Sequence, residues 1–127
     1  MPERRGWLLL FLALLAALLI VPLNATTPER TPCHWVRGRL MAYNGNPTFR
    51  IWPAGTHRLL GVVCLQRGCE GPSEFLPPVL LRFDPSFDRT LWGEFKVCPL
   101  QKERPGWMRM VLVTDARQVT VIDSRER

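Results

Sequence analysis

Apolar and polar side chains alternate along most of the chain after its first quarter. Over residues 35–43, Val36, Leu40 and Ala42 fall on one side of an extended segment, and polar or aromatic residues fall on the other. Because successive side chains of a strand point to opposite faces, this period of two predicts a strand with one face in a core. The pattern recurs at 48–52, 57–63, 90–98 and 118–122, and an apolar run at 108–113 predicts a central strand.

Turn-forming residues separate these segments. Asn-Gly at 44–45 and Pro-Ala-Gly at 53–55 predict tight turns, and another turn is expected at Ala116–Arg117. Residues 65–89 contain four prolines and two glycines, which predicts a loop with at most one helical turn near residues 79–83. Five or six short strands in about ninety residues predict an all-β domain: a small antiparallel barrel of the OB type, or a sandwich.

The beginning of the chain has a different character. Two arginines precede a stretch from Trp7 to Leu23 that carries no charge, which indicates an export signal or a membrane anchor. Ala25 suits a cleavage site, although Leu23 is bulky for one; a spanning helix needs ~20 apolar residues, and Pro22 would disturb its last turn. Both alternatives stay open. Both predict a location outside the cytoplasm, either free in a periplasm or anchored in the inner membrane with the C-terminal domain in the periplasm.

These patterns divide the chain into four parts. Residues 1–25 are expected to be the signal peptide or membrane anchor, and the polar residues 26–32, with two prolines, a tether. Residues 33–123 are expected to form a single β domain, and 124–127 a charged tail.

The composition adds a positive charge to this picture. Lysine and arginine number 17 against 11 acidic residues, which gives a formal net charge of +6. A basic exported domain is attracted to anionic surfaces such as lipid headgroups and envelope polymers. A solubility role, or a GC-rich genome that favours arginine codons, accounts for the same composition.

All four cysteines lie beyond the apolar stretch, where an oxidising compartment would let them pair. Four cysteines allow three pairings, of which Cys64 with Cys69 and Cys33 with Cys98 are preferred, as a local clip and a long-range tie. A metal site that combines these thiols with His34 or His57 is the minor alternative, because no Cys-x-x-Cys pair exists. No metal or cofactor is therefore expected.

One predicted face combines cations with aromatic rings. Its members are Trp35, Arg37, Arg39, Tyr43, Arg50 and Trp52. Guanidinium groups bind anions in bidentate fashion, and flat rings stack on sugars or bases. The face therefore predicts contact with an anionic envelope polymer, a glycan or a lipid headgroup; nucleic acid is less expected outside the cytoplasm. The alternative is that these side chains only cover one another on a solvated sheet.

Catalysis has little support in the sequence. The chain has two histidines and lacks Gly-x-Ser-x-Gly, His-Glu-x-x-His and phosphate-binding loops. A small envelope enzyme would have to use His57 as a base beside a cysteine, and a disulfide at Cys64 would remove that nucleophile. A non-catalytic binding or structural module of the cell envelope is therefore expected. A structural module would bind an envelope protein, for example by adding a strand to an exposed sheet edge.

Two blocks of residues carry a resemblance. The first comprises Gly38-Arg39-Leu40, residues 43–47, Arg50-Ile51-Trp52, residues 55–58 and Leu60-Gly61; the second comprises residues 93–99 and 104–106. Together they resemble a group of small exported envelope proteins of bacteria, a group with no known activity. The resemblance implies an exported single domain and a structural role for Cys98. It does not include the segment from Cys64 to Cys69.

Overall fold

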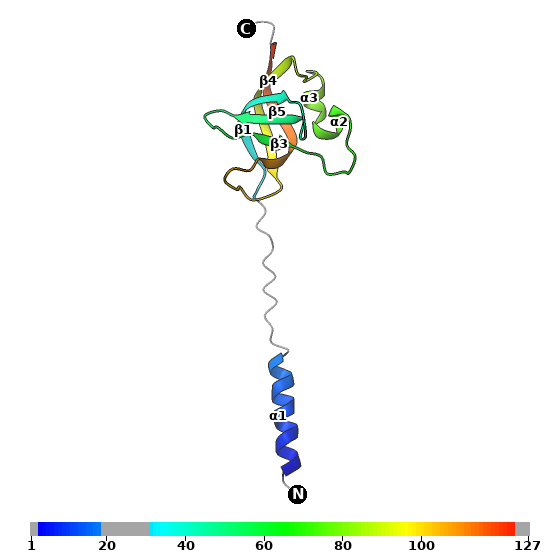
Figure 1. The fold of residues 1–127 in the computed structure, drawn as a ribbon, viewed down its shortest axis with the longest axis vertical. Coiled ribbons are helices and arrows are strands. Elements are labelled where there is room, and N and C mark those ends of the chain that lie inside the picture. The colour runs from blue at the N-terminus through cyan, green and yellow to red at the C-terminus, as the bar shows by residue number, and fades with distance from the viewer. Residues whose placement is uncertain (1–2, 19–30, 124–127) are drawn as a thin grey trace.

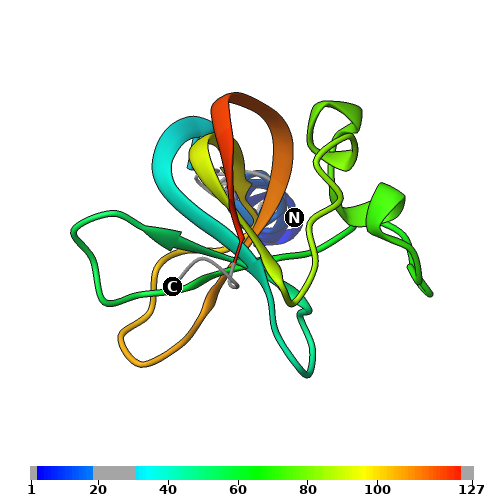
Figure 2. The same cartoon turned by 90° about the horizontal axis from the view of Figure 1, so that it is seen from above.

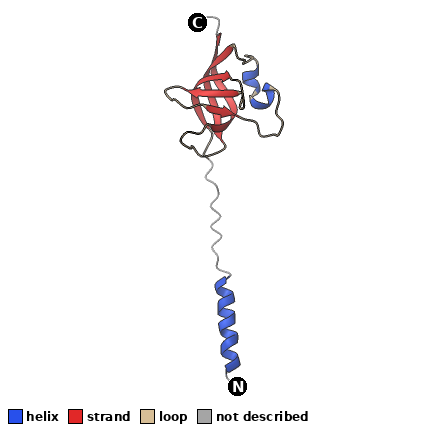
Figure 3. Cartoon of the chain, in the orientation of Figure 1, coloured by secondary structure: helices blue, strands red, loops and turns tan. Residues whose placement is uncertain are grey.

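The structure, a computed structural model, describes residues 3–18 and 31–123. Helix α1 (Glu3–Leu18) precedes a domain of five strands (Figures 1 and 3). The strands are β1 (His34–Ala42), β2 (Phe49–Pro53), β3 (Leu60–Val62), β4 (Arg89–Pro99) and β5 (Arg109–Asp123). Two one-turn helices, α2 (Pro72–Phe75) and α3 (Pro78–Leu81), lie between β3 and β4. The all-β class predicted from the alternation is confirmed.

The five strands close into a ring in the order β1-β2-β3-β5-β4. All neighbours pair antiparallel except β3 and β5, which pair in parallel over three residues each. The sheet is therefore mixed, whereas the sequence predicted a wholly antiparallel one. Helices α2 and α3 lie outside the ring on one side, as the view from above shows (Figure 2).

The interior of the ring is filled by the apolar side chains of the alternating pattern. The fully buried large residues are Leu40, Ile51, Val62, Leu80, Leu91, Phe95, Val97 and Val111. All but Leu80 come from strands, and Leu80 of α3 packs against the same cluster. The predicted inward direction of Ile51 and Phe95 is thus confirmed, and burial of these side chains supplies the main drive for folding.

Two sequence predictions about local structure were wrong. The turn expected at Ala116–Arg117 does not form, because β5 continues through it to Asp123. Between the pairs Trp92–Thr120 and Glu94–Arg117, β5 has one residue more than β4, which is a β-bulge. Gln118, within this bulge, takes a φ of 52°. Such a bulge bends a strand without ending it, so the segments 108–113 and 118–122 belong to one strand, and the domain has the lower of the two expected strand numbers, five. The loop at 65–89 contains α2 as well as the single helical turn that was expected.

Gly38 allows β1 to lie close to β2 where the ring curves. A Cβ atom at this position would overlap the Trp52 carbonyl oxygen and lie 2.9 Å from the Pro53 Cα atom. Gly38 pairs with Pro53 on one side and with Gly93 on the other. Only a residue without a side chain fits between these backbones.

Both preferred disulfides are present. Cys33–Cys98 joins the residue before β1 to the end of β4, with Cα atoms 4.1 Å apart. Cys64–Cys69 closes a short loop after β3. The long bridge fixes the start of the domain to the end of its longest antiparallel pair.

Helix α1 presents apolar side chains on all sides between Trp7 and Leu14. Trp7, Leu8, Leu9, Leu10, Phe11, Leu12 and Leu14 are each between 64% and 71% exposed. Within residues 3–18 and 31–123, no helix combines the length and the hydropathy that a membrane crossing requires. The end of the predicted apolar stretch at Leu23, most of the tether and the tail at 124–127 lie outside the described residues.

Candidate functional site

A groove of about 420 Å³ lies on the outer surface between β1, β2, β4 and the end of β5. It is lined by Arg39, Trp52, Pro53, Ala54, Gly55, Thr56, Trp92 and Ile122. Among these lining residues, Arg39 alone is charged. The groove therefore combines apolar walls with one cation, which is the usual make-up of a small-molecule or sugar subsite.

The strand pairing explains why these residues meet. Arg39 of β1 lies directly opposite Trp52 of β2 on one side and Trp92 of β4 on the other. The guanidinium carbon of Arg39 lies 4.8 Å from the centre of the Trp52 ring, which is within cation–π range. Because residues opposite one another on neighbouring strands share a face, Trp92 lies on the same face as Arg39 and Trp52 and lines the same groove.

The turn after β2 fixes one wall of the groove. The Trp52 Nε1–H donates a hydrogen bond to the Thr56 carbonyl oxygen at 2.6 Å, which holds the ring against the turn. The Thr56 hydroxyl donates to the Pro53 carbonyl oxygen at 2.9 Å, and Gly55 supplies the positive φ of 75° that the turn needs. Trp52 remains 38% exposed, so part of this side chain is accessible to a ligand.

Only two of the six predicted contact residues lie in the groove. Trp35 is instead covered by Arg117 of β5, whose guanidinium carbon lies 4.1 Å from the ring centre. Arg117 Nε also donates to the Glu94 carboxylate at 2.5 Å. Arg37 lies on the same strand face as Arg39, opposite Glu94 in the pairing of β1 with β4. The face therefore continues beyond the groove as a mixed array of charges.

Arg50 and Tyr43 form a separate pair at the β1–β2 turn. The Arg50 guanidinium carbon lies 4.8 Å from the Tyr43 ring centre, and Arg50 Nε donates to the Pro47 carbonyl oxygen at 3.0 Å. Through these two contacts, the Arg50 side chain stabilises the β1–β2 turn. The structure thus divides the predicted face into the groove at Arg39 and Trp52 and two places where an arginine covers an aromatic ring.

Trp92 and Ile122 were missed as site residues in the sequence. The alternation of 90–98 gives Trp92 an outward direction, but the sequence does not show which strand lies beside it. Strand register, which places Trp92 opposite Arg39, is what brings it to the groove. Ile122 belongs to the end of β5, which continues past the turn that the sequence predicted.

Neither histidine lies next to a free cysteine in the part of the chain that the structure describes, because all four cysteines there are in disulfides. His57 is exposed in the segment between β2 and β3, and Cys64 is bonded to Cys69. His34 is exposed, and its Nδ1 atom lies 3.2 Å from the Pro32 carbonyl oxygen. Within residues 3–18 and 31–123, no three His, Cys, Asp or Glu side chains are grouped so as to hold a metal ion.

A second groove, of about 450 Å³, lies between α2, the loop that contains the short disulfide and the first part of β5. Its walls include Val63, Leu65, Phe75, Leu112 and Thr114. The pairing of β5 with β3 ends at Val111, whereas its pairing with β4 continues. After Val111, the edge of β5 that faces away from β4 therefore borders this groove.

Comparisons with family models, with curated proteins and with solved structures found no match to the chain. The resemblance to small envelope proteins therefore remains a prediction, and functional inference depends on the geometry above.

Proposed function

We propose that the protein is an exported, membrane-associated binding module of the cell envelope, and that its groove at Arg39, Trp52 and Trp92 binds an anionic glycan. The observation that carries the proposal is a guanidinium group that lies over the Trp52 ring, in an otherwise uncharged groove that Trp92 also lines. Export is supported by the apolar N-terminal segment and by two disulfides, which are typical of oxidising compartments.

The chemistry of the groove fits a sugar with a carboxylate, sulfate or phosphate. The apolar face of a pyranose ring packs on an exposed indole, and the two tryptophans provide such surfaces. Arg39 supplies two parallel N–H donors for an anionic substituent on the same ring. A neutral glycan would leave this cation without a partner, so charge selects among sugars of similar shape.

The surroundings of the groove favour a polymer over a single sugar. Arg37 lies two residues from Arg39 on the same face of β1, and Glu94 is already paired with Arg117. A polysaccharide that continues from the groove along β1 would therefore meet a second cation, Arg37. The acid opposite Arg37, Glu94, is partly neutralised by Arg117. The net charge of +6 adds a longer-range attraction, which salt screens.

Binding to polysaccharides tests the proposal. The full chain in detergent is titrated with oligomers of polygalacturonate, with neutral dextran oligomers and with single-stranded DNA at two salt concentrations. The proposal predicts saturable binding of the carboxylated glycan that weakens with salt, and no binding of dextran. Equal retention of every polyanion in proportion to its charge would contradict a specific site. Tighter binding of DNA would reassign the groove to bases.

A non-catalytic role is part of the proposal. A nucleophile–base pair at Cys64 and His57 would need a free thiolate, and Cys64 is held in a disulfide. Titration of free thiols on the folded, unreduced protein checks this point, because a reactive cysteine would consume the reagent.

A second candidate function is the binding of an envelope protein at the β5 edge. The observation that favours it is the groove of about 450 Å³ beside residues 112–114, where an extended peptide would pair with the strand. Photo-crosslinking from position 114 in intact cells tests it. A discrete crosslinked partner would support this candidate, and crosslinks absent from 114 would remove it.

A further inference from the structure

The loop between β4 and β5 lies where the chain enters the domain. Cys33 is bonded to Cys98, the last residue but one of β4, and Arg109 Nη2 donates to the Thr31 hydroxyl oxygen at 2.9 Å. Figure 1 shows this loop at the lower end of the ring, opposite the end where β5 finishes. Thr31 and Cys33, at the start of the described domain, therefore lie beside this loop.

The loop exposes a tryptophan and a leucine at this end. Trp107 is 68% exposed and Leu100 is 49% exposed. Residues 104–107 form a tight turn in which the Trp107 N–H donates to the Arg104 carbonyl oxygen at 3.1 Å, and Gly106 has a φ of 78°. The Arg104 guanidinium carbon lies 4.9 Å from the centre of the Trp107 ring. An exposed indole with a cation beside it suits the boundary between water and lipid, where tryptophan is enriched.

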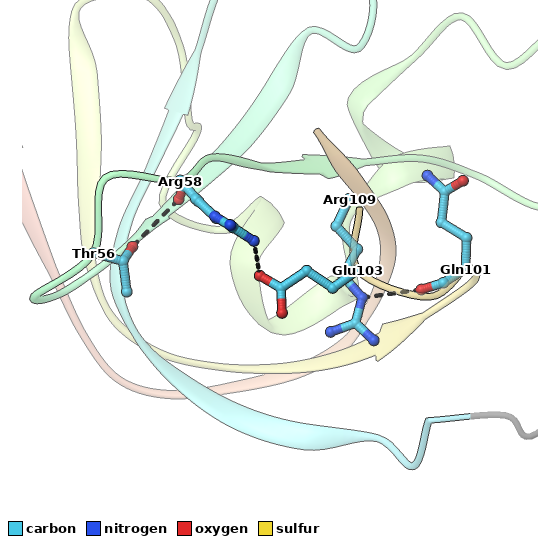
Figure 4. A network of polar contacts seen from close by, with 5 residues as sticks. All are labelled: Thr56, Arg58, Gln101, Glu103 and Arg109. Carbon is cyan, nitrogen blue, oxygen red and sulfur yellow. Dashed lines mark hydrogen bonds and ion pairs between the residues drawn. The ribbon is translucent and has the colours of Figure 1, made fainter. Parts of the chain in front are cut away.

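The charges around Trp107 are mainly positive. Lys102, Arg104 and Arg109 lie in or beside the loop, and its acid Glu103 is paired with Arg58 of the β2–β3 segment (Figure 4). The ion pair leaves Lys102 and Arg104 without an acidic neighbour in the loop. Juxtamembrane lysines and arginines are attracted to anionic lipid headgroups.

Hydrogen bonds hold the loop in this arrangement. Arg109 Nε donates to the Gln101 carbonyl oxygen at 3.0 Å, and the Leu100 N–H donates to the Met110 carbonyl oxygen at 3.0 Å. Figure 4 shows how the Arg109 and Glu103 contacts join the loop to its neighbours. A surface that is ordered before binding loses less entropy on docking than a disordered one.

We propose that this loop end, defined by Leu100, Lys102, Arg104 and Trp107, docks on the anionic headgroups of the bilayer that holds the apolar N-terminal segment. The proposal rests on the membrane association in the proposed function, and it is independent of the glycan groove. Leu18 and Thr31 are joined by a chain that spans at most about 45 Å, so a domain attached to a membrane-bound α1 cannot leave the headgroup region by more than that length. The opposite end carries a comparable exposed ring, Phe87 at 60%, without the adjacent tether.

Quenching of tryptophan fluorescence by brominated lipid tests the proposal. The full chain is reconstituted in vesicles of brominated phosphatidylcholine with or without phosphatidylglycerol. The signal of Trp107 is obtained by subtracting that of Trp107→Phe. We expect the Trp107 signal to be quenched in the anionic vesicles. Changing Lys102→Gln and Arg104→Gln together should lower the ratio of docked to undocked protein by about fivefold for each charge.

A matched control moves the indole to the other end. The variant Phe87→Trp in the Trp107→Phe background has an exposed indole just before the start of β4. Most of the length of β4 separates this position from Cys98, which is bonded to Cys33 beside the tether. We expect this indole to remain unquenched. Unquenched Trp107, equal quenching at position 87, or no effect of removing the two charges would each overturn the proposal. Quenching of Trp7 reports separately on α1. If Trp7 is also unquenched, the membrane association in the proposed function fails. Failure of the glycan-binding proposal alone would leave the quenching of Trp107 and Trp7 unchanged.

Discussion

The guanidinium carbon of Arg39 lies 4.8 Å from the centre of the Trp52 ring, and the two residues are direct partners in the pairing of β1 with β2. The pairing of β1 with β4 places Trp92 on the other side of the same arginine. The rings provide a surface on which a sugar can pack, and the guanidinium group can bind its acidic substituent. This relationship is the basis of the functional proposal, and it depends on strand register.

Removal of the Arg39 charge should weaken glycan binding selectively. In Arg39→Gln, affinity for polygalacturonate oligomers should fall about tenfold or more, because a charge-assisted hydrogen bond is lost. Arg82→Gln is the matched control: Arg82 also lies over an aromatic ring, that of Phe83 at 4.7 Å, and the change in net charge is the same. Isothermal titration calorimetry of the two variants compares them, and equal losses would show that net charge alone sets the affinity.

Removal of the Glu94 charge should have the opposite effect. Glu94 accepts a hydrogen bond from Arg117 and lies opposite Arg37, so it offsets positive charge on the proposed polymer path. Glu94→Gln should raise the affinity for the carboxylated glycan about threefold at low salt, a typical size for one surface charge. Asp84→Asn removes an acid paired with Arg89 at the start of β4, on the side of the groove away from Arg37, and should change the affinity much less. The prediction fails if both variants gain affinity equally.

The two disulfides should contribute unequally to stability. Cys33–Cys98 joins residues 65 apart, and Cys64–Cys69 joins residues 5 apart. In the chain-entropy model these loops correspond to about 4 and about 2 kcal/mol of the free energy of unfolding. Denaturant unfolding of the double variants Cys33→Ala with Cys98→Ala, and Cys64→Ala with Cys69→Ala, measures the difference. A larger loss from the short bridge would mean that it holds the α2 segment in place by more than chain entropy.

Gly38→Ala should destabilise the domain strongly. Its Cβ atom would overlap the Trp52 carbonyl oxygen, and backbone cannot move aside as a flexible side chain can. We expect a loss of about 3 kcal/mol or more in the free energy of unfolding, at the upper end of overpacking effects. At Gly71 the nearest atom to an added Cβ is 3.7 Å away, so Gly71→Ala should be close to neutral. Thermal unfolding followed by circular dichroism compares the two, and similar melting temperatures would contradict the close approach of β1 and β2.

Local pattern in the sequence was sufficient for the fold class and for the core. The alternation at 35–43 and 90–98 identified Leu40 and Phe95 as inward residues, and both are fully buried. The preferred disulfide pairings also form. These features depend on the period of a strand and on even cysteine number, which one segment at a time can reveal.

Features that depend on contacts between segments were not predictable in the same way. The parallel pairing of β3 with β5 has no local signal, and neither does the bulge near Gln118, beside which the sequence predicts a turn. The candidate site shows the same limit: Arg39 and Trp52 were recognised from alternation, whereas Trp92 needed the register of β4. Arg117, which covers Trp35, was not recognised for the same reason.

The indole N–H signals of the full chain test the groove most directly. Trp52 donates its indole N–H to Thr56 at 2.6 Å inside the groove, whereas Trp107 lies on the β4–β5 loop. In nuclear magnetic resonance spectra of the detergent-solubilised chain labelled at tryptophan, polygalacturonate oligomers should shift the signals of Trp52 and Trp92 and leave that of Trp107 unchanged. A saturating titration with no shift of Trp52 or Trp92, or a shift confined to Trp107, would contradict the proposed site.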